Sequence, residues 1–155
     1  MLNPQRAAYL IFATGLVTII GAWIFEYVGY LPCELCLKQR WAYYAAIPLA
    51  LLIATYAPSK PLLYLLALIW IASMIFGIYH SGVEWKFWAG PTTCTGDGGI
   101  SLGLPDLSKP VVMCDQPAIR IFGLSLAGWN AVISLALAYI ALKTARHHGS
   151  SSVSQ

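Results

Sequence analysis

Four cysteines in two pairs offer the clearest chemistry in this sequence of 155 residues. Cys33 and Cys36 form a C-x-x-C motif, and Cys94 and Cys114 follow farther along the chain, separated by a glycine-rich segment. A C-x-x-C motif at the start of a helix suits disulfide exchange, because one helical turn brings the sulfurs together and the helix N-terminus stabilises a thiolate. The second pair could close a disulfide that the thiolate of another protein can attack. Two such pairs predict a relay of dithiol–disulfide exchange.

Other polar side chains accompany the cysteines. Arg40 follows Cys36 by one helical turn, so the two would share a helix face. An arginine close to hydrocarbon needs a partner, such as a thiolate or a polarisable carbonyl oxygen. Otherwise it extends toward lipid headgroups. His80 is expected to be either an interfacial polar residue or a participant in the redox chemistry, and Glu26 either a surface carboxylate or part of a proton route.

Two other kinds of site use four cysteines. A zinc site usually contains two C-x-x-C pairs, and this sequence has only one. Structural disulfides are common in oxidising compartments and could brace the segments between helices. Arg40, together with the position of Cys36 at the edge of an apolar segment, favours redox chemistry, because a structural brace requires neither.

The elements that must position these residues are membrane-spanning helices. Hydrophobic residues make up 59% of the chain and charged residues only 10%, whereas about a quarter of a soluble domain is charged. A helix needs about 20 residues to cross the hydrocarbon, and roughly 17 can suffice. The sequence therefore predicts an all-α membrane protein, a four-transmembrane-helix bundle in one domain (1–146), with a disordered tail at 147–155. The predicted spans are about 7–28, 41–57, 62–80 and 121–142.

Four spans leave both termini on one side of the membrane and the loops 29–40 and 81–120 on the other. All four cysteines fall in these two loops, as expected if that side is oxidising. We therefore predict periplasmic loops, cytoplasmic termini and a bacterial inner (cytoplasmic) membrane. Glycines and prolines are frequent in the loop 81–120, which indicates a mobile flap. The net charge of +3 is too small and too scattered to indicate nucleic-acid binding.

Several short motifs give the sequence a family resemblance. They are Leu31–Cys36 followed by Arg40, then Gly90–Thr95, Cys114-Asp115 and Phe122–Asn130. With these motifs the sequence resembles the DsbB family of bacterial disulfide-generating membrane proteins over nearly its whole length. The order of the cysteines, with the C-x-x-C motif first, is also DsbB-like. The related vitamin K epoxide reductase fold places its C-x-x-C motif after the loop pair and fits less well.

The resemblance implies an enzyme, a protein-dithiol:quinone oxidoreductase. A periplasmic DsbA-like thiol oxidase would deliver electrons to the loop cysteines, which would pass them to the C-x-x-C pair and on to a membrane quinone, ubiquinone or menaquinone. No metal would be required. Two alternatives stay open: a membrane scaffold or assembly protein with structural disulfides, and a vitamin K epoxide reductase-like enzyme. The catalytic residues would be Cys33, Cys36, Cys94 and Cys114, and the quinone-binding residues Arg40 and His80.

Overall fold

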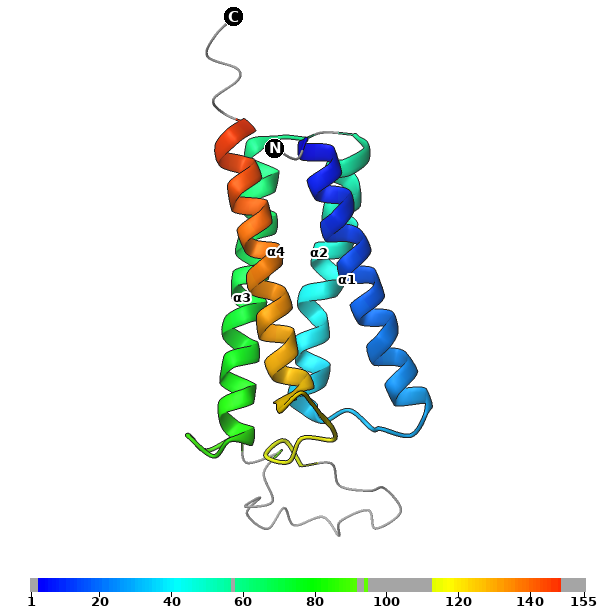
Figure 1. Ribbon diagram of the computed structural model, residues 1–155, viewed down its shortest axis with the longest axis vertical. Helices are drawn as coiled ribbons and strands as arrows, with labels where there is room; N and C mark the ends of the chain where they lie inside the picture. Colours follow the sequence, from blue (N-terminus) through cyan, green and yellow to red (C-terminus); the bar gives the residue numbers. More distant parts are fainter. Residues whose placement is uncertain (1–2, 57, 92–93, 95–112, 149–155) are drawn as a thin grey trace, which may run out of the picture.

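Four long helices and one short hairpin make up the fold. The computed structural model describes residues 3–56, 58–91, 94 and 113–148. Successive helices run in opposite directions, so α1 begins and α4 ends at the same end of the bundle, while the hairpin lies at the other end (Figure 1). The helices are α1 (Pro4–Tyr27), α2 (Glu34–Thr55), α3 (Lys60–Glu84) and α4 (Leu126–His148), and the strands are β1 (Arg120–Ile121) and β2 (Leu124–Ser125).

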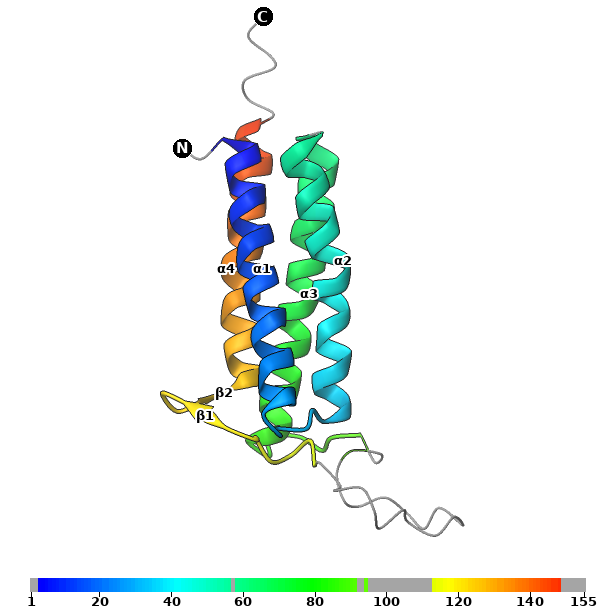
Figure 2. The same ribbon diagram turned by 90° about the vertical axis from the view of Figure 1, so that its right-hand side faces the viewer.

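Each helix packs mainly on two others, which closes the bundle. α1 contacts α2 and α4, and α3 contacts the same two helices. Figure 2 shows α1 beside α4 and α3 beside α2. α3 and α4 approach closely at Gly77, where a Cβ atom would lie 3.0 Å from the backbone nitrogen of Ala131. The missing side chain therefore lets the two backbones come together, as small residues do between membrane helices.

The interior holds aliphatic and small side chains from all four helices. Ile11, Ala50, Leu66 and Ala141 are fully buried and come from α1 to α4 in turn. Trp70 of α3 is the largest side chain that is completely buried. These residues belong to one large apolar cluster, and among the described residues a second, smaller cluster surrounds Cys33.

Large apolar side chains also cover the outside of the bundle. Val17, Leu68, Ile75 and Tyr139 are each more than half exposed. A soluble protein rarely exposes so much apolar surface. The helices α1 and α3, and residues Leu126–His147 of α4, are long and apolar enough to cross a membrane. The predicted all-α architecture is confirmed, and three of its four helices have the properties of membrane spans.

α2 differs from the other three helices at its beginning. Its first two turns carry Glu34, Lys38, Gln39 and Arg40, which lower its apolar character although it has 22 residues. Glu34 and Lys38 form an ion pair at 2.7 Å on the outside of the helix. Gln39 is buried, and the side chain of Arg40 is only 11% exposed. Two of the polar residues that distinguish α2 therefore face protein.

The helix bounds depart from those predicted at several points. α1 starts at Pro4 rather than at 7, because the side chain of Asn3 caps its first turn. The apolar span predicted from 41 belongs to a helix that begins at Glu34, at the C-x-x-C motif as predicted, where Cys33 caps it in the same way. α3 continues to Glu84 rather than ending at 80. Capping hydrogen bonds, which the apolar pattern does not reveal, set the first two of these ends.

The two ends of α4 also differ from the prediction. α4 begins at Leu126 instead of 121, because residues 120–125 form the hairpin β1–β2. Phe122 (φ 51) and Gly123 (φ 82) adopt the left-handed conformation that such a tight turn requires. α4 continues through His148, so the first two residues of the predicted disordered tail are helical. The rest of that tail, 149–155, and most of the predicted flap, 92–93 and 95–112, lie outside the described residues.

Candidate functional site

The C-x-x-C motif occupies the first turn of α2. Cys33 is the N-cap residue, and its sulfur accepts a hydrogen bond from the N–H of Cys36 at 3.2 Å. The two sulfurs lie 2.7 Å apart, and both cysteines are free thiols, with Cys33 buried and Cys36 partly buried. A negative charge on Cys33 would therefore face the N-terminus of a helix, which stabilises it.

A disulfide between Cys94 and Cys114 lies against Cys33. Its two Cα atoms are 5.3 Å apart, and the N–H of Cys114 donates to the carbonyl oxygen of Cys94 at 2.7 Å. The sulfurs of Cys33, Cys94 and Cys114 all lie within 4.8 Å of one another, in a buried cluster with Leu35 and Val83. The structure thus brings the two cysteine pairs together, with Cys33 at the point of contact.

Cys36 lines an apolar cavity of about 420 Å³ between α1, the start of α2 and the start of α4. In Figure 1, α1 leans away from the other helices toward this end of the bundle. A mainly apolar cavity with a few polar groups suits an apolar ligand that carries hydrogen-bond acceptors. The wall includes the apolar residues Val17, Ala22, Phe25, Leu31, Ile121, Leu126 and Trp129 and the polar residues Thr18, Gln39, Arg40, Tyr43 and Asn130.

Arg40 lines the same cavity one turn beyond Cys36. Its guanidinium donates to the carboxylate of Glu26 in α1, with a distance of 2.6 Å from nitrogen to oxygen. A charged partner offsets much of the cost of placing an arginine close to hydrocarbon. The sequence pattern did not predict this ion pair, because Glu26 and Arg40 belong to different helices. Glu26, expected at the surface or on a proton route, is the ion-pair partner of Arg40.

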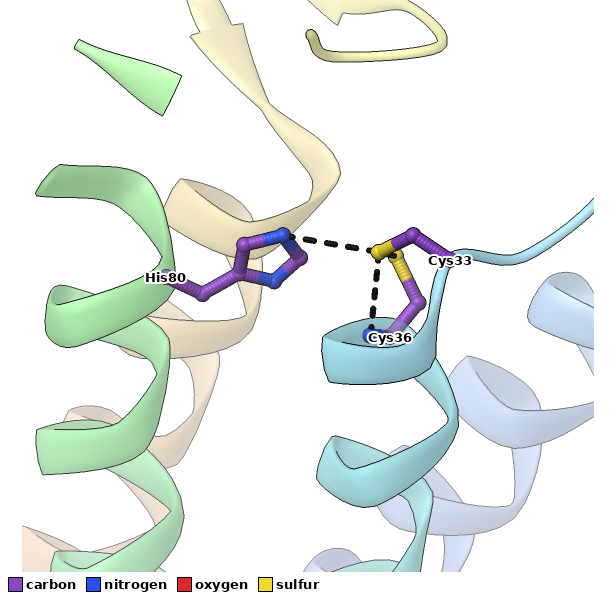
Figure 3. A group of neighbouring side chains, drawn as sticks. All are labelled: Cys33, Cys36 and His80. Atoms are coloured by element: carbon purple, nitrogen blue, oxygen red, sulfur yellow. Dashed lines mark hydrogen bonds between the residues drawn. The ribbon is translucent and has the colours of Figure 1, made fainter. Parts of the chain in front are cut away.

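His80 of α3 contacts the C-x-x-C motif from the side. Its Nε2 atom lies 3.6 Å from the sulfur of Cys33 (Figure 3), and its side chain is 1% exposed. Its Nδ1 atom lies 2.7 Å from the amide nitrogen of Gln39, and Glu84 approaches Nε2 at 3.8 Å. His80 does not line the cavity. That His80 binds a quinone stays a prediction, and its observed partner is Cys33.

These contacts change the acidity of Cys33. The hydrogen bond with the side chain of Cys36, and next the hydrogen bond with His80, lower the pKa of the Cys33 thiol to about 5, although burial opposes the shift. A thiolate at neutral pH is the form that carries out disulfide exchange. The first turn of α2 therefore holds a preformed nucleophile or leaving group.

Several buried polar residues at the site were not predicted. Gln39 and Tyr43 continue the helix stripe that starts at Cys36, at the i+3 and i+7 positions, and that spacing was available in the sequence. Asn130 is a buried amide in a helix otherwise fit to cross a membrane, and polar residues of that kind often mark a functional site. Glu84, also buried, had no comparable signal, because it lies beside a charged, aromatic segment at the helix end.

Among the described residues, two groups of side chains bring possible metal ligands together. The ligand atoms of Cys33, Cys36 and His80 lie within 4.8 Å of one another, as do those of Cys33, Cys94 and Cys114. The second group contains a disulfide, whose sulfurs are not thiolate ligands. The first group offers three ligands, one fewer than a closed structural zinc site needs. The geometry therefore favours disulfide exchange over a structural metal site.

Comparisons with known proteins place this arrangement in a family. No solved structure matches the chain significantly. The chain is 29% identical over 131 residues, 79% of its length and 76% of the relative's, to a protein of Rickettsia prowazekii (strain Madrid E) described as "Uncharacterized protein RP370". The family model "Disulfide bond formation protein DsbB" matches residues 4–144, which include α1, α2, α3, most of α4 and all four cysteines. The chain therefore belongs to the DsbB family of disulfide bond formation proteins.

Proposed function

We propose that this protein is a protein-dithiol:quinone oxidoreductase, which oxidises a periplasmic DsbA-like partner and reduces a membrane quinone. The position of the C-x-x-C motif between a second disulfide and an apolar cavity carries the proposal. The sulfur of Cys33 lies within 4.8 Å of those of Cys94 and Cys114, whereas Cys36 lines the cavity. Electrons can therefore enter the motif at one cysteine and leave it at the other.

The bundle would cross a bacterial inner membrane four times, with α2 as the fourth span. α2 packs against α1 and α3, and both have the length and composition of membrane helices. A helix of 22 residues between them would share the hydrocarbon that they occupy. We place the cysteine end in the periplasm, because disulfides persist in an oxidising compartment. Both termini would then be cytoplasmic.

The first exchange takes place at the loop disulfide. A thiolate of the partner attacks the sulfur of Cys94, a mixed disulfide forms, and Cys114 leaves as a thiolate. The second thiolate of the partner attacks the mixed disulfide, so the partner departs oxidised and Cys94 is released as a thiolate. Two electrons have then passed from the partner to the loop pair.

The second exchange passes these electrons inward. The thiolate of Cys114 attacks Cys33 in the Cys33–Cys36 disulfide, and Cys36 leaves as a thiolate at the cavity. Cys94 then attacks Cys114, which closes the loop disulfide again and releases Cys33. The closed Cys94–Cys114 bond and the two free thiols of the C-x-x-C motif correspond to the state after this step.

The last step reduces the quinone. Cys33 and Cys36 give up two electrons and their disulfide re-forms, while the quinone takes up two electrons and two protons and becomes a quinol. Arg40, at the cavity wall, is placed to stabilise negative charge on a quinone oxygen. A DsbA-type partner has a potential of about −120 mV, so its oxidation requires a strong electron acceptor, and a quinone can reach the site through lipid.

Quinone reduction by the purified protein tests the proposal. The protein is reduced, freed of reductant and mixed with ubiquinone-1, and the quinone absorbance is followed with and without a DsbA-like dithiol. We expect two quinones to be reduced per fully reduced protein, one for each cysteine pair, and continuous turnover once the dithiol is added. The matched control is Cys36→Ser, which keeps Cys33 and the loop disulfide but removes the thiol at the cavity. Folded wild-type protein that leaves the quinone oxidised would refute the proposal and favour a scaffold with structural disulfides.

A further inference from the structure

We propose that a buried hydrogen-bond chain fixes the proton of His80 on Nε2, where it is directed at the sulfur of Cys33. The chain consists of Tyr43, Asn130 and Gln39, in that order. His80 would then be a neutral hydrogen-bond donor to the Cys33 thiolate, and the three chain residues would be positioning residues. The proposal deepens the proposed function and rests on it, because the Cys33 thiolate matters only if the motif exchanges disulfides.

Three short contacts link the chain from α4 and α2 to α3. The hydroxyl of Tyr43 donates to Oδ1 of Asn130 at 2.6 Å. The Nδ2 amide of Asn130 donates to Oε1 of Gln39 at 2.9 Å, and Nε2 of Gln39 lies 2.7 Å from Nδ1 of His80. All four side chains are less than a tenth exposed. Water therefore has little access to compete for these hydrogen bonds.

The direction of the chain follows from the chemistry of the amides. The oxygen of Asn130 accepts the hydrogen bond from the hydroxyl of Tyr43, and its NH₂ group donates to Gln39. The oxygen of Gln39 accepts that bond, which leaves its NH₂ group facing His80. An NH₂ group can only donate, so Nδ1 of His80 must accept. A neutral imidazole with Nδ1 as acceptor carries its proton on Nε2.

The proton on Nε2 faces the reacting sulfur. The distance from Nε2 to the sulfur of Cys33 is 3.6 Å, within the range of a hydrogen bond to sulfur. Cys33 leaves as a thiolate when the loop disulfide closes, and the donor stabilises that charge. The same thiolate later closes the Cys33–Cys36 disulfide. A neutral donor supports both steps without tying the thiolate into an ion pair.

Glu84 gives the proton of His80 a second acceptor. One oxygen of Glu84 lies 3.8 Å from Nε2, and Ser125 forms a hydrogen bond with the carboxyl group. The other oxygen is buried and has no hydrogen-bond partner among the described residues. When Cys33 is held in a disulfide it is a poor acceptor, and the N–H of His80 can then turn to Glu84. The Nε2–H group of His80 thus has an acceptor when Cys33 is a thiolate and also when Cys33 is held in a disulfide.

Nitrogen NMR of His80 tests the proposal directly. The chain contains three histidines, and His147→Gln with His148→Gln at the far end of α4 leaves His80 as the only one. In reduced protein labelled with ¹⁵N-histidine, in detergent at pH 7, we expect an unprotonated Nδ1 and a protonated Nε2. A proton on Nδ1, alone or together with one on Nε2, would overturn the proposal. This measurement requires no substitution among the residues of the site.

The variant Gln39→Glu tests whether the hydrogen-bond chain determines which nitrogen of His80 carries the proton. A carboxylate only accepts, so at this position it turns Nδ1 of His80 from an acceptor into a donor, and Nδ1 should become protonated. The matched control is Ser73→Ala, which removes the bond from Ser134 to Ser73 at 2.9 Å in the same buried region but leaves the chain intact. An unchanged His80 spectrum in folded Gln39→Glu protein would show that Gln39 does not position the proton.

Alkylation of Cys33 measures the effect on the thiolate without a quinone. Loss of a hydrogen bond to a charged group typically changes an equilibrium about tenfold or more, so His80→Leu should slow alkylation at pH 4, where the thiolate is the minor form, by about that factor. His80→Gln retains an N–H donor and should restore part of the rate. Equal rates in the wild type and His80→Leu would overturn the proposal. Failure of quinone reduction in the wild type would refute the proposed function alone, because neither the NMR nor the alkylation result depends on it.

Discussion

The two cysteines of the C-x-x-C motif differ because they occupy different positions in one helical turn. Cys33 caps the helix, so its sulfur receives the N–H of Cys36 and contacts His80. Cys36 lies inside the helix and borders the apolar cavity. The hydrogen bonds at Cys33 stabilise a thiolate there, and the cavity would give Cys36 access to the quinone of the proposed function. At this scale, the chemistry is divided between two residues of one motif.

The pKa of Cys33 leads to a prediction about its reactivity. Because the hydrogen bonds with Cys36 and His80 lower the pKa from 9.0 to about 5, the thiolate should form as pH rises through 5 and be complete by pH 7. In reduced protein, the rate of Cys33 alkylation by iodoacetamide, followed by mass spectrometry between pH 4 and pH 9, should level off near neutrality. A rate that is still rising at pH 8 would contradict the stabilised thiolate.

Arg40 should matter for the quinone and not for the loop disulfide. Arg40→Ala removes a charge-assisted donor from the cavity wall, and we expect the KM for ubiquinone-1 to rise about tenfold or more, with unchanged exchange between the partner and Cys94. The control is Glu26→Gln, which breaks the ion pair at 2.6 Å but keeps the guanidinium, and should have a smaller effect. Unchanged quinone kinetics in Arg40→Ala would show that Arg40 has no role in quinone binding beyond its ion pair with Glu26.

At the scale of the helices, the packing of α3 against α4 determines the position of His80 relative to Cys33. Gly77 lies one turn before His80 and meets Ala131 and the carbonyl oxygen of Ala127, which is 3.2 Å from the position of a Cβ atom. His80 reaches Cys33 only if α3 keeps this distance from its neighbours. Close packing of α3 on α4, one turn before His80, therefore supports the contact of His80 with Cys33.

Gly77→Ala tests that contact. The added methyl group would lie 3.0 Å from backbone, and overpacking of this kind costs about 1–3 kcal/mol, so the melting temperature in detergent should fall and quinone reduction should slow. The matched control is Gly21→Ala in α1, where a Cβ atom meets nothing within 4 Å, and alanine should be neutral or stabilising because of its helix propensity. Equal melting temperatures for the two variants would contradict the close packing of α3 on α4.

The whole molecule places a buried disulfide and an apolar cavity at one end of a helix bundle. The cavity opens among the apolar helices α1, α2 and α4, while the loop disulfide packs on Cys33 beyond the start of α2. If the proposed function holds, a soluble partner and a lipid-soluble quinone would therefore react at separate places. The C-x-x-C motif would connect these two reactions.

Cys114→Ser should trap the encounter with the partner. Without Cys114 the loop disulfide is absent, and Cys94 should accumulate in a mixed disulfide with an oxidised DsbA-like partner, visible on a non-reducing gel as a single cross-linked species. Cys94→Ser is the matched control and should give no such species. A trapped complex that depends on Cys33 or Cys36 instead would reverse the proposed order of electron flow.

Composition and local periodicity by themselves determined the class of fold and part of the site. Long uncharged segments predict apolar helices because an α-helix of about 20 residues is what crosses a bilayer. The start of a helix at the C-x-x-C motif, and the position of Arg40 one turn beyond Cys36, follow from 3.6-residue periodicity within one segment. These features depend only on residues close together in the chain.

Only the tertiary structure decided which distant side chains meet. His80 against Cys33, Glu26 against Arg40, and the chain from Tyr43 through Asn130 to Gln39 each join different helices. Such contacts depend on the rotation of each helix about its axis and on the distance between helices. Small residues at the helix interfaces set both quantities together, so no pattern within one helix predicts them. The sequence alone therefore determined which residues could do redox chemistry, whereas packing decided which side chains from other helices contact them.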